Sequence, residues 1–148
     1  MSNVDNPLQA LSEAMAAAVA RAAAWTVLVD ARRRLPASGI VIAADQVLTA
    51  EHVLENNSHI GVVLADGTRL QAELAGRDPG SDLAVLHLEK AVAAPAVPAA
   101  VEAQIGELVL ALGRPSKEGI QASLGVVSAS GGPLRTGRGG LLKRYLRT

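Results

Sequence analysis

Two side chains in this sequence, His52 and Asp82, are of the types that move and hold protons. His52 comes shortly after the run Val47-Leu-Thr-Ala50, which reads as a buried strand, and Asp82 directly precedes a second apolar run, Leu83 to Leu88. An imidazole can take up and return a proton near neutral pH, and a carboxylate at its Nδ1 fixes the tautomer and stabilises the imidazolium. Together they could act in acyl transfer, with His52 as the general base and Asp82 as the carboxylate that orients it. The spacing alone leaves open that Asp82 is a satisfied turn residue and His52 a surface histidine.

The other candidate residues give no sign of a metal or cofactor site. His59 and His87 lie in predicted strands without a third ligand at metal spacing, so we expect both to be structural. Asp78 precedes Pro79-Gly80 and is expected to be a turn carboxylate. Cysteine is absent, which excludes disulfides and thiolate metal sites. The glycine-rich segments match neither a P-loop nor a dinucleotide fingerprint, and we expect no cofactor.

Composition argues against nucleic-acid binding. The chain has 148 residues, enough to bury a core, and 49% of them are hydrophobic, yet it has one Trp, one Tyr and no Phe on which bases could stack. Its formal net charge is zero, so no overall field attracts phosphates. Beyond Glu118 there are no acidic residues. We expect the basic residues there to lie on solvated loops and strands, a binding patch being the alternative: Arg135, Arg138, Lys143, Arg144 and Arg147.

The N-terminal segment, residues 1–24, predicts an amphipathic helix. Asn6 is a good N-cap with Pro7 at the first helical position, and apolar residues then recur at helical spacing to about residue 24. We expect the apolar stripe to pack on the domain that follows. Arg21 interrupts the alanine-rich stretch, so no membrane span is predicted, and acidic residues with no basic n-region argue against a secretory signal. As written, the chain is expected to be cytoplasmic.

From Trp25 onward, short β-type runs alternate with turn chemistry. The dipeptides Asp45-Gln46 and Asp66-Gly67 suit tight hairpin turns, and the regular spacing favours an antiparallel barrel or sandwich. The Ala- and Pro-rich stretch 91–100 reads as a linker. Six strands are predicted before it and three after it: Thr26 to Arg33, Ser38 to Ala43, Val47 to Thr49, His59 to Leu64, Thr68 to Ala75 and Leu83 to Leu88, then Leu108 to Leu112, Gln121 to Ser128 and Leu141 to Arg147.

Five blocks of the sequence, in order, resemble the HtrA/Deg-type proteases, the bacterial branch of trypsin-like serine peptidases. The blocks are Ser38-Gly-Ile-Val-Ile42, Leu48-Thr-Ala-Glu-His-Val53, Asp82-Leu-Ala-Val-Leu86, Ile105-Gly-Glu-Leu-Val-Leu-Ala-Leu-Gly-Arg-Pro115 and Leu124-Gly-Val-Val-Ser-Ala129. The resemblance implies an all-β, chymotrypsin-like double β-barrel. The N-terminal helix (1–24) would precede a complete first barrel (25–90), a linker (91–100) and an incomplete second barrel (101–148). In this family His52 matches the catalytic base and Asp82 its orienting carboxylate.

The nucleophile of such a protease does not occur at its usual place within these residues. The family carries it in a Gly-Asn-Ser-Gly-Gly motif or a close variant, preceded by a segment resembling Arg144-Tyr-Leu-Arg-Thr148, so we expect the Ser just beyond Thr148. Ser130-Gly-Gly-Pro133 mimics the motif, but it comes too soon after Asp82 and has Ser128 where the motif needs Gly. Without the nucleophile and its oxyanion-binding amides, the 148-residue chain alone is expected to be inactive.

The resemblance implies a serine endopeptidase of the protein quality-control type, acting on unfolded or extended polypeptides. Members of the family commonly carry a PDZ domain, assemble as trimers and are often periplasmic or membrane-anchored. The alternative is a catalytically inactive pseudoprotease or adaptor that keeps the barrel and binds protein chains. The residues encoded after Thr148 would distinguish the active endopeptidase from the inactive pseudoprotease.

Overall fold

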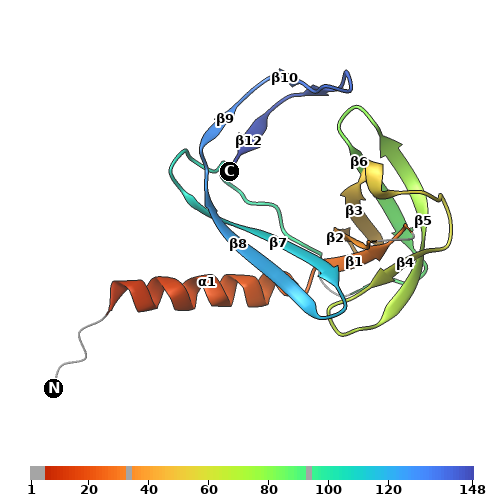
Figure 1. Cartoon of the computed structure of the whole chain (residues 1–148), viewed down its shortest axis with the longest axis horizontal. Coiled ribbons are helices and arrows are strands. Elements are labelled where there is room, and N and C mark those ends of the chain that lie inside the picture. Colours follow the sequence, from red (N-terminus) through yellow and green to blue (C-terminus); the bar gives the residue numbers. More distant parts are fainter. Residues whose placement is uncertain (1–5, 33–34, 93–94) are drawn as a thin grey trace.

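A computed structural model describes residues 6–32, 35–92 and 95–148, and it shows one helix followed by β-strands (Figure 1). Three parts of the sequence-based predictions lie outside the described residues. These are residues 1–5 of the N-terminal segment, the end of the first predicted strand at Arg33, and residues 93–94 of the predicted linker.

The predicted helix is present as α1, Pro7–Ala23. The Asn6 side chain accepts a hydrogen bond from the Leu8 N–H at 3.1 Å, which is the expected N-cap. The apolar stripe packs on the following domain only in part. No residue of the helix is buried, Leu8 is 77% exposed, and the N-terminal part of the helix projects away from the barrel (Figure 1). The stripe residues nearer the barrel are half-buried: Met15, Ala18, Val19 and Ala22. Beyond Met15 the stripe consists of Ala18, Val19 and Ala22, small side chains that offer little apolar area to bury. Among the described residues, no helix has both the length and the apolarity needed to traverse a bilayer.

The six predicted strands before the linker form a closed antiparallel barrel in the order β1-β2-β3-β6-β5-β4. The barrel closes where β1 pairs with β4, with Leu28 opposite Val63. At the tip of the β4–β5 hairpin, Asp66 accepts from the Thr68 N–H and Gly67 has φ +87°, the geometry that the Asp-Gly pair predicted. The strands are β1 (Thr26–Asp30), β2 (Ala37–Ala43), β3 (Gln46–Ala50), β4 (Ile60–Val63), β5 (Arg69–Asp78) and β6 (Leu83–Leu88).

The barrel interior is filled by aliphatic side chains. Along β5 the pattern alternates, with Leu70 and Ala72 buried and Arg69, Gln71 and Glu73 exposed, as expected for a strand with one face on a core. The side chains with less than 2% exposure include Val27, Val29, Val41, Val47, Ile60, Val62, Leu86 and Leu88. Most of these side chains are the β-branched Val and Ile, which fit the pleated surface of a strand.

The C-terminal part of the chain forms three separate two-stranded antiparallel pairs: β7 with β8, β9 with β12, and β10 with β11. The predicted strand Leu141 to Arg147 is divided into β11 and β12, and β9 and β10 were not predicted. The bounds are β7 (Leu108–Ser116), β8 (Gly119–Val126), β9 (Ala129–Gly131), β10 (Leu134–Arg135), β11 (Leu141–Leu142) and β12 (Tyr145–Arg147). The predicted all-β fold with one preceding helix is confirmed, whereas the domain boundaries stay a prediction.

One arginine connects β7 to the first barrel. Arg114 is 8% exposed, and its guanidinium donates from Nε to the Thr26 carbonyl at 2.8 Å and from Nη2 to the Ala23 carbonyl at 3.2 Å. Its backbone N–H donates to the Ser38 hydroxyl at 2.8 Å. A buried cation needs such acceptors, and the C-terminal carbonyls of a helix favour positive charge. Arg114 therefore joins β7 to the end of α1 and to β1 and β2.

Candidate active site

The fold places His52 and Asp82 at the same end of the barrel. His52 lies in a single 3-10 turn, η1 (Glu51–Val53), directly after β3, and Asp82 directly precedes β6. Strands β3 and β6 are antiparallel neighbours with Ala50 opposite Leu83. The turn that follows β3, with His52 in its middle, and the residue that precedes β6 are therefore adjacent in space.

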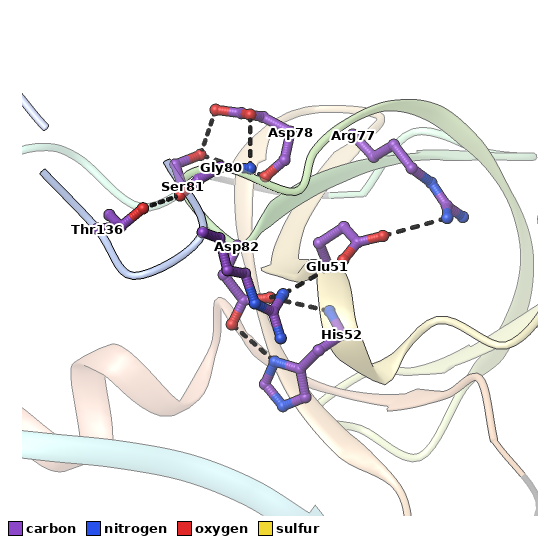
Figure 2. Close-up of polar contacts among 9 residues, drawn as sticks. Glu51, His52, Arg77, Asp78, Gly80, Ser81, Asp82 and Thr136 are labelled. Atoms are coloured by element: carbon purple, nitrogen blue, oxygen red, sulfur yellow. Dashed lines mark hydrogen bonds and ion pairs between the residues drawn. The ribbon is translucent and has the colours of Figure 1, made fainter. Parts of the chain in front are cut away.

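The two side chains are joined by a short hydrogen bond. His52 Nδ1 lies 2.7 Å from Asp82 Oδ2, and the His52 backbone N–H donates to the other carboxylate oxygen, Oδ1, at 2.9 Å (Figure 2). An ionised carboxylate only accepts, so the proton between them resides on Nδ1. The second ring nitrogen, Nε2, is then left unprotonated in the neutral ring and can accept a proton from a substrate or a nucleophile. The imidazole side chain is 49% exposed and the carboxylate 36%.

The backbone of Asp82 is held in an unusual conformation. Its φ is +60°, a left-handed region that non-glycine residues seldom adopt, and its carbonyl accepts from the Glu51 N–H at 3.0 Å. The preceding turn is organised by Asp78, as predicted, whose carboxylate accepts from the Gly80 N–H at 3.0 Å and from the Ser81 hydroxyl at 2.6 Å (Figure 2). These bonds aim the Asp82 carboxylate at His52.

The environment of Asp82 favours its ionised form. The pKa of the Asp82 carboxyl lies below its ordinary value of 3.8, first because it accepts the His52 backbone N–H and second because it hydrogen bonds with the imidazole. Desolvation acts in the opposite direction, and the charges of His52 and Arg138 lower the pKa further. The carboxylate is therefore ionised at neutral pH, as a carboxylate that orients a catalytic histidine must be.

Charged residues around this pair were not predicted from the sequence. Arg138, from the loop between β10 and β11, places its Nη1 3.3 Å from Asp82 Oδ1 and 3.6 Å from Glu51 Oε2. Glu51 also pairs with Arg77, whose Nη1 lies 3.2 Å from Oε1. Arg138 belongs to the basic stretch expected to lie on solvated surface, and no local pattern distinguishes it from the other four. Arg144, from the same stretch, instead pairs with Glu102.

The remaining candidate residues lie elsewhere. Ser130 is exposed in β9 opposite Leu146, and in the part of the chain that the structure describes, no hydrogen bond joins its hydroxyl to His52. On the outside of the barrel, His87 Nδ1 lies 3.5 Å from Asp45 Oδ2. His59 Nδ1 lies 3.2 Å from the hydroxyl oxygen of its neighbour Ser58. His87 and Asp45 thus form a second, looser histidine–aspartate pair in the same barrel.

Comparison with known proteins identifies the family. The model of the trypsin-like peptidase domain matches residues 37–148. A probable periplasmic serine endoprotease, DegP-like, from Ectopseudomonas mendocina is 41% identical over 96 residues, which cover 64% of this chain and 20% of that protein. The serine endoprotease DegS of Haemophilus influenzae is 37% identical over 97 residues, covering 64% of this chain and 28% of that one. The chain thus spans between 20% and 28% of the length of these relatives.

A solved structure shares the fold. The serine endoprotease from Yersinia pestis matches with a TM-score of 0.67 and 32% sequence identity, over 84% of this chain and 50% of that one. Family model, relatives and structure agree with the motif blocks in the sequence. The chain therefore belongs to the trypsin-like peptidase domain family, and it resembles the Deg-type serine endoproteases.

Proposed function

We propose that this chain supplies the general base of a serine endopeptidase and the carboxylate that orients it. His52 is the base, Asp82 orients it, and the nucleophilic Ser is encoded just after Thr148. The observation that carries the proposal is the 2.7 Å hydrogen bond between His52 Nδ1 and Asp82 Oδ2, with the second carboxylate oxygen held by the His52 backbone. This arrangement leaves Nε2 as the proton acceptor.

The chemistry follows from that geometry. His52 Nε2 removes the proton of the Ser hydroxyl as the oxygen attacks the scissile carbonyl, and the same nitrogen later returns the proton to the leaving amine. Asp82 stays ionised throughout and stabilises the imidazolium that forms in between, which its lowered pKa favours. The substrates are polypeptides, by analogy with the endoproteases that the chain resembles.

The first test is to read the coding sequence downstream of Thr148 and to express the complete product. A Gly-x-Ser-Gly-Gly motif there, together with casein hydrolysis, is the expected result. A stop codon or another residue in place of the Ser would favour a barrel that binds protein chains without cutting them.

The second test distinguishes the proposed His52–Asp82 pair from the looser His87–Asp45 pair. In the complete product, His52→Ala is expected to lower kcat about 10⁶-fold and Asp82→Asn about 10⁴-fold, the losses typical of a missing base and of a wrong tautomer. His87→Ala, which removes the looser pair with Asp45 on the same barrel, is the matched control and is expected to retain activity. Unchanged hydrolysis by the His52→Ala variant would refute the proposal.

A further inference from the structure

The carboxylate that orients His52 has a third polar neighbour besides the imidazole and the His52 backbone. Arg138 Nη1 approaches Asp82 Oδ1 at 3.3 Å and Glu51 Oε2 at 3.6 Å. Glu51 is largely buried, with 14% of its side chain exposed, and its other oxygen is held by Arg77. The guanidinium therefore lies between two carboxylates whose negative charges would otherwise repel each other.

The loop that carries Arg138 is anchored on the first barrel independently of this ion pair. The Thr136 hydroxyl donates to the Gly80 carbonyl at 2.6 Å, two residues before Asp82 (Figure 2). The same hydroxyl oxygen accepts from the Gly140 N–H at 3.0 Å, and the Thr136 N–H donates to the Gly140 carbonyl at 2.9 Å. The loop 136–140 is thus a closed turn seated on the Asp82 segment.

The anchoring leaves no room for a side chain at the closest point. A Cβ added to Gly140 would overlap the backbone of Gly80, whereas one added to Gly137 would meet nothing within 4 Å. The contact between loop and barrel is therefore a backbone-to-backbone approach. It fixes the origin of the Arg138 side chain relative to the Asp82 carboxylate.

The two oxygens of Asp82 have different roles because of this neighbour. Oδ1 accepts from the His52 backbone N–H and from Arg138, while Oδ2 hydrogen bonds with the imidazole. Donors on Oδ1 restrict rotation of the carboxylate, so that Oδ2 keeps its direction toward Nδ1. Asp82 also has a left-handed φ of +60°, a conformation that persists only where surrounding contacts hold it.

We propose that Arg138 is a positioning residue for the His52–Asp82 pair: by bridging Asp82 and Glu51 from loop 136–140, it holds the carboxylate in the rotamer that orients the imidazole. The geometry of the pair thus depends on a residue from the C-terminal part of the chain, although both members of the pair belong to the first barrel. The catalytic relevance of this role rests on the proposed function, but the positioning itself does not.

The positioning can be measured on the 148-residue chain by NMR, through the low-field resonance of the His52 Nδ1 proton and its exchange with water. In Arg138→Ala the exchange rate is expected to rise about three- to tenfold, as fits one half-exposed guanidinium that contacts two carboxylates. Arg138→Lys, which keeps the charge, is expected to recover part of the protection. Arg144→Ala, which breaks an ion pair in the same basic stretch, is the matched control and is expected to change nothing.

Three results would overturn the proposal: a wild-type chain without this resonance, equal exchange rates in wild type and Arg138→Ala, or an equal change in Arg144→Ala. If Arg138→Ala does not fold, as judged by circular dichroism, Arg138→Gln gives the same comparison with the side-chain length largely kept. In the complete protease, Arg138→Ala should lower kcat and leave KM unchanged. Failure of the proposed function would appear as activity that survives His52→Ala, a result independent of the NMR comparison.

Discussion

Replacing Arg114 with methionine is expected to lower the free energy of unfolding by about 2–4 kcal/mol. The methionine keeps an apolar stem in a site that is 8% exposed, but it removes the donors to the Thr26 and Ala23 carbonyls. The end of α1, the first strand of the barrel and β7 then lose their shared polar contact.

The magnitude follows from the two bonds. A hydrogen bond from a charged donor contributes about 1.5–3 kcal/mol, which gives roughly 3–6 kcal/mol for the pair. Part of this is offset, because the variant no longer buries a guanidinium whose partners, within the described residues, are carbonyls and not carboxylates. The remaining loss is a large fraction of the 5–15 kcal/mol typical of a domain. Arg114→Lys, whose single ammonium cannot reproduce the planar fork, is expected to lose about half as much.

Urea denaturation followed by the fluorescence of Trp25 is a suitable assay. Trp25 is the single tryptophan, it packs partly against the core, and its carbonyl accepts from the Val41 N–H at 2.9 Å, next to the site of the substitution. Lys117→Met, an exposed cation-to-methionine change in the same hairpin, is the control and should shift stability by less than about 0.5 kcal/mol. A loss in Arg114→Met no larger than in this control would refute the reasoning.

Two further predictions concern the site. Because the folded-state pKa of Asp82 is depressed, the ionised carboxylate stabilises the fold above pH 3.8, and this stabilisation is lost as the pH falls through the lowered pKa. On acidification, the melting temperature of Asp82→Asn should therefore fall less than that of wild type, and equal falls would contradict this. Gly140→Ala places a Cβ against the Gly80 backbone, so it should displace loop 136–140 and speed the exchange of the His52 Nδ1 proton, as Arg138→Ala does. Gly137→Ala, whose Cβ meets nothing within 4 Å, should not change this exchange rate. The same exchange rate in both glycine variants would argue against the docked loop.

Local patterns in the sequence predicted most of the first barrel. Alternation of apolar and polar residues, the Asp-Gly turn at Asp66 and the Asn6 cap each depend on neighbours a few residues away, so the sequence shows them directly. The short strands β9 and β10 were missed, because two or three residues are too few for a periodic signal. The motif blocks around His52 and Asp82 predicted the pair itself, and the adjacency of β3 and β6 explains its proximity.

The contacts that surround the pair were decided only in three dimensions. Arg138 lies 56 positions from Asp82, and it resembles every other exposed arginine until loop 136–140 docks on Gly80. Likewise the helical period predicted α1, but not that its apolar stripe is half-buried at most while Arg114 binds the carbonyl at the end of the helix. The physical reason is common to both cases. Secondary structure follows from the chain's own local preferences, whereas the partner of a charged side chain depends on which distant backbone segments can approach closely enough to hold it.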